Sequence, residues 1–132
     1  MPQDSFHNEC DRISQGVDGV QYERQRWAKT EGPMLAKLVE LAHAAIADRD
    51  DFELTEEGAS TDIKRFVLKV HSFRVVGVVM WLERGHAMIN AEEVGRSKYA
   101  LTPGAAISAD FQHVDADWMA RTLQELMARI QF

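Results

Sequence analysis

The chain has 132 residues, a net charge of −6 at neutral pH and a hydrophobic share of 45%. Its length predicts one domain, 1–132, since domains average roughly 150 residues, with a helical arm over 1–32 and an α+β core over 33–132. The hydrophobic share excludes disordered and low-complexity proteins, and the acidic charge argues against a nucleic-acid-binding protein. Apolar runs stay below the roughly 18 residues of a transmembrane helix, so we expect no membrane span.

The one cysteine, Cys10, cannot form an internal disulfide, which is typical of proteins from a reducing compartment. The chain begins MPQDSFHNEC, and this start lacks the basic stretch followed by an apolar run that marks a secretory signal. We therefore expect a cytoplasmic protein that carries no cleaved leader.

Between residues 6 and 27 the apolar residues recur with a helical period, at successive spacings of 4, 3, 4, 3 and 7. Such spacing predicts one apolar helix face. Gly16 and Gly19 each disfavour a helix interior by about 1 kcal/mol, so a break there is the alternative to one continuous helix. The face can pair within the chain or with a partner, and its candidate partner-binding residues are Val17, Val20 and Trp27. The whole face comprises Phe6, Cys10, Ile13, Val17, Val20 and Trp27.

A second helix is predicted from Pro33 onwards, because proline at the first helical position sacrifices no hydrogen bond. Leu35, Leu38, Ala42 and Ile46 follow at helical spacing. The helix should end within 47–51, where three aspartates follow one another closely. Their charges oppose the helix dipole, each by a few tenths of a kcal/mol, and the sequence offers no structural reason for them. They are Asp48, Asp50 and Asp51.

From Phe52 the apolar period changes to two, which predicts strands over 52–56, 63–70, 75–82 and 86–92. Turns are expected over 57–62, near 71–73 and at Arg84-Gly85. The strand 75–82 is apolar on both faces, as in a central strand covered on both sides. It carries Trp81, a further candidate partner-binding residue. A final hairpin, 98–101 with 105–111, is predicted around Pro103-Gly104.

The last element is an amphipathic helix that Asp115 or Asp117 caps, with an apolar stripe running from Trp118 to Ile130. The predicted fold is therefore α+β: a single antiparallel sheet of four to six strands, with N-terminal helices and a C-terminal amphipathic helix packed on it, in the order α-α-β(4–6)-α.

Charge is unevenly distributed along the chain. Residues 33–62 hold eight acidic and two basic residues, whereas 63–101 hold three acidic and seven basic residues. The basic strands predict an anion-binding face, with solvated surface charge as the alternative. Screening over about 8 Å at physiological salt makes nucleic-acid binding by so few charges weak or absent. The candidate anion-binding residues are Arg65, Lys69, Arg74, Arg96 and Lys98.

No catalytic signature is present, so catalytic residues stay unknown, and we expect no metal site and no cofactor. The five histidines form no HxH or HxxxH pair. His71 and His86 could meet only in one strand register. His7 lies one helical turn from Cys10 and could activate that thiol, although the apolar face predicts that Cys10 is buried. The paired carboxylates Glu56-Glu57 and Glu92-Glu93 are adjacent residues whose side chains point apart.

These observations favour a non-enzymatic protein-binding or accessory domain that acts through an apolar helix or sheet surface on a protein partner or on a second copy, as a homodimer. The alternative is a small-molecule-binding domain or an unrecognised enzyme, with a small apolar ligand in a pocket between sheet and helix. The third possibility is weak nucleic-acid binding by the basic strands. Candidate pocket residues are Met80, Met88, Met119 and Met127.

Overall fold

The computed structural model describes residues 2–60 and 62–132. The chain divides between Pro33 and Met34 into two compact units. Helix α3 (Glu31–Ile46) begins in the first unit and continues into the second. The prediction of a single domain over 1–132 stays a prediction.

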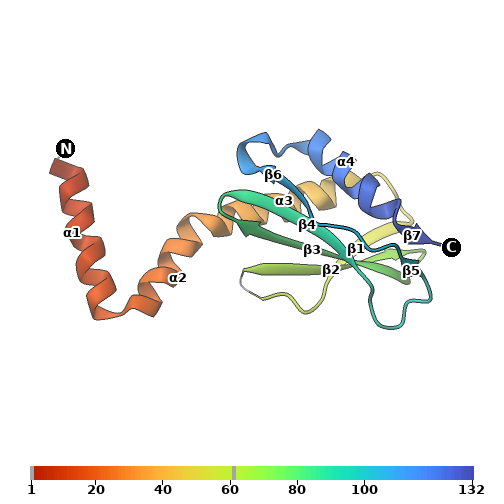
Figure 1. Cartoon of the computed structure of the whole chain (residues 1–132), viewed down its shortest axis with the longest axis horizontal. Helices are drawn as coiled ribbons and strands as arrows, with labels where there is room; N and C mark the ends of the chain where they lie inside the picture. Colours follow the sequence, from red (N-terminus) through yellow and green to blue (C-terminus); the bar gives the residue numbers. More distant parts are fainter. Residues whose placement is uncertain (1, 61) are drawn as a thin grey trace. The chain divides into compact units, whose positions relative to one another are not determined.

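The first unit contains α1 (Pro2–Val17) and α2 (Gly19–Lys29), which form an elbow (Figure 1). The helix break predicted as an alternative is confirmed, and one continuous helix is wrong. Asp18 explains the break: its backbone is extended, and its carboxylate accepts a hydrogen bond from the Gln21 backbone N–H at 3.1 Å. An aspartate in this position starts a new helix, and Gly16 and Gly19 lower the helix propensity on either side of it.

The second unit is built on a five-stranded antiparallel sheet of order β1-β2-β3-β4-β6. The C-terminal helix follows the strands, and the α+β class with an antiparallel sheet is confirmed. A separate two-stranded ladder joins β5 and β7. The elements are β1 (Phe52–Glu56), β2 (Ile63–Val70), β3 (Phe73–Glu83), β4 (His86–Glu92), β5 (Ala100–Leu101), β6 (Ile107–Asp110), a 3₁₀ turn (Phe111–His113), α4 (Ala116–Met127) and β7 (Ile130–Gln131).

Two-residue turns connect the central strands, at Arg84-Gly85 as predicted and at His71-Ser72, within the turn predicted near 71–73. His71 and Ser72 join β2 to β3 with φ of 50° and 68°, and Arg84 and Gly85 join β3 to β4 with φ of 49° and 78°. Two successive positive φ values match the twist of antiparallel strands. Thr61, within the turn predicted over 57–62, lies outside the described residues.

The final hairpin predicted for 98–101 and 105–111 is wrong. Instead β6 pairs with β4, with Ile107 opposite Ile89, and this pairing places an apolar residue of β6 beside a fully buried one. Strand β5 pairs with β7, where Leu101 faces Ile130. The predicted helical position of Ile130 is therefore also wrong: α4 ends at Met127, and Thr102 then donates a backbone hydrogen bond to the Arg129 carbonyl at 2.8 Å.

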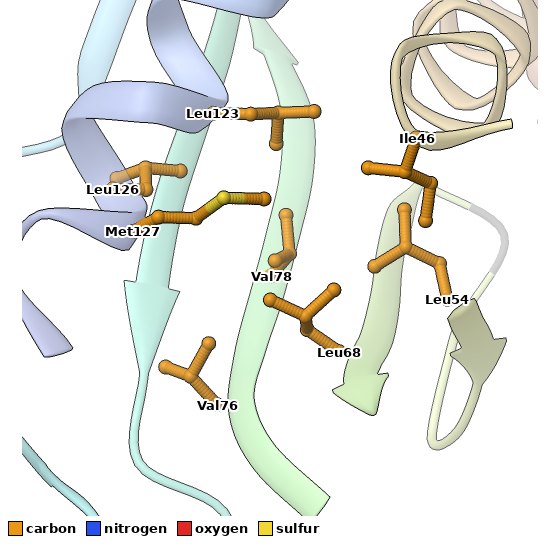
Figure 2. Close-up of a pocket in the computed structure, with 8 residues that line it drawn as sticks. All are labelled: Ile46, Leu54, Leu68, Val76, Val78, Leu123, Leu126 and Met127. Atoms are coloured by element: carbon orange, nitrogen blue, oxygen red, sulfur yellow. The ribbon is translucent and has the colours of Figure 1, made fainter. Parts of the chain in front are cut away.

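The core lies between one face of the sheet and the helices α3 and α4 (Figures 1 and 2). Strand β3 is central, and its residues from Val75 to Met80 are buried, as its apolar character predicted. Asp115 caps α4, as one of the two predicted caps, by accepting a hydrogen bond from the Trp118 backbone N–H at 2.8 Å. Within the described residues, no helix has the length and apolar character needed to cross a membrane.

Candidate functional site

The outer helix α1 carries an apolar face that is open to solvent. At 100° per residue, Phe6, Cys10, Ile13 and Val17 fall within an arc of about 60°. Their side chains are exposed, with relative exposures of 66% for Phe6, 52% for Ile13 and 81% for Val17. Cys10 is exposed as well, so the expectation that this cysteine is buried is wrong. Such a row of exposed apolar residues is typical of an interaction surface.

This face borders a groove of about 450 Å³ at the elbow between α1 and α2, which we call the elbow groove. Cys10, Ile13 and Val17 line it from α1, and Gln21 and Gln25 line it from α2. One wall is therefore apolar and the other carries uncharged amides. An apolar ridge flanked by hydrogen-bonding groups would fit between them.

Two of the predicted partner-binding residues lie on α2. Val20 is exposed, whereas Trp27 is partly buried. The Trp27 ring packs closely on Gly32, since a Cβ added at Gly32 would lie 3.1 Å from the Cζ3 atom of the ring. Trp27 therefore packs within the first unit, and Val20 leaves its side chain free for a partner.

The fourth predicted partner-binding residue, Trp81, lies on β3 in the second unit. Cross-strand pairing places it directly between Ile63 of β2 and Met88 of β4. Strand alternation puts this row on the sheet face opposite Val76 and Val78, and thus opposite α3 and α4. All three side chains of the row are partly buried, so they are less exposed than the apolar side chains of α1.

Acidic neighbours bind two of the predicted anion-binding residues. Arg65 Nη1 donates to both carboxylate oxygens of Glu92, at 2.8 and 2.9 Å. Arg74 Nη1 donates to Glu57 Oε2 at 2.7 Å, and its Nε donates to the Gly95 carbonyl at 2.9 Å. These arginines therefore join segments that are distant in sequence, and their charges are largely neutralised.

The other three residues lie in different surroundings. Lys69 is paired with Arg74 across β2 and β3, and Lys98 lies over the Tyr99 ring, with its Nζ 5.6 Å from the ring centroid. The Arg74 hydrogen bond holds the pKa of Glu57 below its ordinary value, against the opposing effect of desolvation, and the charges of Arg74, Lys69 and Arg96 lower it further. The structure thus brings Lys69, Arg74 and Arg96 together, around a carboxylate that already belongs to the chain.

The residues considered for catalysis are dispersed. His71 and His86 lie at opposite ends of β3, whose 11 residues span about 35 Å, so the structure does not bring them together. Within residues 2–60 and 62–132, no three His, Cys, Asp or Glu side chains are grouped to hold a metal ion. The Oε1 of Glu56 lies 4.0 Å from the Nζ of Lys64. Glu93 accepts a hydrogen bond from the Leu101 backbone N–H at 3.4 Å.

The pocket predicted between sheet and helix corresponds to a cavity of about 10 Å³ (Figure 2). Ile46 of α3 and Leu123, Leu126 and Met127 of α4 close over the strands. This volume is about that of one water molecule, so the enclosed space holds no larger ligand in this conformation. Met80 and Met119 are fully buried core residues.

An open groove of about 300 Å³, which we call the helix groove, lies between α3 and α4 above this cavity. The sequence did not predict this groove. The pattern that could have indicated it is an alanine at an exposed helix position next to larger apolar residues, as at Ala45 and Ala120. Ile46, Leu123 and Met127 line both spaces. The full lining of the helix groove is Ala45, Ile46, Arg49, Phe52, Ala120, Leu123, Gln124 and Met127.

No protein-family model, no curated protein and no solved structure matches this chain. Its function must therefore be inferred from its own surfaces, which include the apolar face of α1 and the helix groove.

Proposed function

We propose that this protein is a non-enzymatic protein-binding domain that acts through the apolar face of α1 and the elbow groove, with a second copy of itself as partner. The observation that supports this most is the alignment of four apolar side chains on one exposed helix face. A helix of 16 residues is marginally stable alone in water. A partner on this face would therefore stabilise α1 as well as bury its apolar side chains.

The expected affinity follows from the side chains that a dimer would bury. Full burial of a Val, Ile or Phe side chain contributes about 1.5–3 kcal/mol, and a dimer would bury Phe6, Ile13 and Val17 from each copy. Association itself costs about 4–15 kcal/mol. With six partly exposed side chains against that cost, we expect a dissociation constant on the order of micromolar.

The residue pattern favours an antiparallel arrangement. A twofold axis between Asp11 and Arg12 would place Phe6 against Val17 of the second copy and Cys10 against Ile13 of the second copy. Each contact then joins a larger side chain to a smaller one, which fills space better than Phe against Phe. Antiparallel helices also align their dipoles favourably.

The charges around the face are compatible with this pairing. Glu9 is the carboxylate beside the apolar row, and Arg12 of the same helix donates to it through Nε at 2.6 Å. In the antiparallel pair Glu9 would face Gly16 of the second copy, which carries no side chain. A chain with net charge −6 can therefore approach itself here without a direct contact between like charges.

Sedimentation equilibrium between about 1 and 200 μM tests the proposal. Wild type should approach twice the 15.0 kDa chain mass, and the Ile13→Asp/Val17→Asp variant should stay monomeric. Asn8→Asp/Gln15→Asp is the matched control, because it adds the same charge on the opposite face of α1. A monomeric wild type would contradict the proposal, and so would a control that dissociates as readily as the apolar-face variant.

Disulfide formation tests the orientation, because Cys10 is the only cysteine in the chain. Wild type is mixed with Cys10→Ser/Ile13→Cys and oxidised mildly. The antiparallel pair should give crosslinked heterodimers, because position 13 of one copy faces Cys10 of the other. A parallel pair would instead crosslink wild type to wild type through the two Cys10 thiols.

We also propose a cytoplasmic location, on the basis of the single cysteine, which is typical of proteins from a reducing compartment. Binding to nucleic acid has less support than binding to protein, because Glu92 and Glu57 already bind Arg65 and Arg74. A small apolar ligand has less support because the cavity beneath α3 and α4 encloses only about 10 Å³.

A further inference from the structure

We propose that the helix groove between α3 and α4 binds a basic amphipathic helix of another protein. This site lies in the second unit and is separate from the face of α1 on which self-association depends. The proposal rests on the shape of the helix groove, on its apolar lining and on the sign of the charge at its rim.

The helix groove has the form of a helix-binding site. Exposed alanines, Ala45 on α3 and Ala120 on α4, line it from opposite sides. Ile46, Leu123 and Met127 form its floor, since they also line the cavity beneath (Figure 2). Small side chains at the walls leave room for a partner's apolar residues at positions i, i+3 or i+4, and i+7, as in other helix-in-groove contacts.

The rim of the helix groove is acidic. Asp117 precedes Ala120 by three residues in α4, so it lies on the same side of that helix as the groove-lining alanine. Asp48 lies beyond the end of α3, between the groove-lining residues Ile46 and Arg49 in the sequence. Asp50 continues the acidic rim beyond the end of α3. Within the part of the chain that the structure describes, none of these three aspartates forms an ion pair with a side chain.

Arg49 is the one basic residue in the lining of the helix groove, and its charge is already matched. Its Nε and Nη2 donate to the two carboxylate oxygens of Asp51, at 2.9 and 2.7 Å. Its guanidinium also lies 5.3 Å from the centre of the Phe52 ring. Once Arg49 and Asp51 cancel, the rim keeps the negative charge of three aspartates.

This charge identifies the class of partner. A helix with Lys or Arg on both sides of an apolar ridge would place positive charge near Asp48 on one side and near Asp117 on the other. A fatty acid or an acidic helix would bring negative charge to the same rim. Helix α1 of a second copy fits poorly, because its charged side chains include three acids and one arginine.

Fluorescence anisotropy with two labelled peptides tests the proposal. Both are helical peptides of about 18 residues with the same leucine ridge, and they carry either lysine or glutamate on the flanks. The lysine peptide should bind at least about tenfold more tightly than the glutamate peptide. Measurement in the Ile13→Asp/Val17→Asp background removes the face of α1 as a binding surface, so failure at one site is distinguishable from failure at the other.

Ala120→Trp fills the helix groove without changing any charge. Because Ala120 is exposed, the fold should tolerate the larger side chain, and circular dichroism checks that the variant is folded. We expect at least about tenfold weaker binding of the lysine peptide. A folded Ala120→Trp that binds this peptide as tightly as wild type would overturn the proposal, because attraction to the acidic chain alone would then explain the binding.

The rim charges are tested separately with Asp48→Asn and Asp117→Asn. Each change should weaken lysine-peptide binding about two- to fivefold at low salt, as expected for one exposed ion pair, and the loss should shrink as salt is added. Glu125→Gln is the matched control, because Glu125 is an exposed acid of α4 that lies about 140° around the helix from the groove-lining Ala120, whereas Asp117 lies about 60° from it. An equal loss with Glu125→Gln would overturn the assignment of the rim.

Discussion

Gly77 is the position where the structure makes its sharpest prediction about stability. It lies in β3 opposite Glu92 of β4, and a Cβ added there would stand 2.7 Å from the Cγ of Glu92 and 2.9 Å from the Cγ1 of Val94. Neither neighbour moves away freely. Glu92 is held by Arg65 through two hydrogen bonds of 2.8 and 2.9 Å, and Val94 belongs to the segment that leaves β4.

The cost of Gly77→Ala can be estimated from these contacts. Overpacking of a filled site costs about 1–3 kcal/mol, whereas replacing a strand glycine by alanine returns roughly 0.5–1 kcal/mol of chain entropy. Since the two nearest atoms are not the ends of free side chains, the steric cost should dominate. We expect the free energy of unfolding to fall by about 1–2 kcal/mol.

Urea unfolding followed by circular dichroism measures this change. Gly95→Ala is the matched control, because a Cβ at Gly95 would meet nothing within 4 Å, and its stability should stay within about 0.5 kcal/mol of wild type. A Gly77→Ala protein as stable as the control would refute the reasoning, since it would mean that Glu92 and Val94 do not close over β3 in solution.

Three further outcomes follow from single contacts. Asp115→Ala should lose about 1 kcal/mol of unfolding free energy, because α4 loses its cap, and Asp115→Asn should retain most of it; urea unfolding distinguishes the two. Leu38→Ala should lose about 2–5 kcal/mol in the same assay, because Leu38 is fully buried. Glu57→Gln tests the Arg74 contact: the lowered pKa of Glu57 means that its ionised form stabilises the fold at neutral pH, and that this contribution disappears as the pH falls through the lowered pKa. The urea midpoints of wild type and Glu57→Gln should therefore differ at pH 7 and converge in acid.

The elements that the sequence predicted correctly are those whose signal is local. Alternation from Phe52 onwards identifies the strands, and the spacing of Leu35, Leu38 and Ala42 identifies α3, because both periods repeat within a few residues. The ladder of β5 with β7 is different. Each strand has two residues, too few to show a period, and they are separated by the whole of β6 and α4.

The same distinction explains which surfaces could be predicted. Phe6, Ile13 and Val17 recur at helical spacing, so the apolar face of α1 could be read from the sequence, although nothing in the pattern showed that Cys10 would be exposed with them. Val20 continues the pattern in sequence but lies on α2, beyond the break at Asp18. The partners of Arg65 and Arg74 lie 27 and 17 residues away, so the sequence showed the basic charges without the acids that neutralise them. The helix groove depends on the separation of α3 and α4 over the sheet, which no local period records.

The structure accounts for Asp51, one of the three aspartates that follow α3, through its two hydrogen bonds with Arg49. Part of the acidic segment is balanced across strands, where Glu56 lies near Lys64 and Glu57 binds Arg74. Asp48 and Asp50 are not balanced in this way, and their position against the helix dipole costs a few tenths of a kcal/mol each. This cost in stability is small. Uncompensated negative charge, in turn, raises the rate at which a positively charged partner associates. Neutralising Asp48 and Asp50 should therefore leave the free energy of unfolding unchanged or slightly higher, while it weakens binding of the lysine peptide at the helix groove. This opposite response of stability and affinity distinguishes a charge that serves binding from a charge that serves the fold.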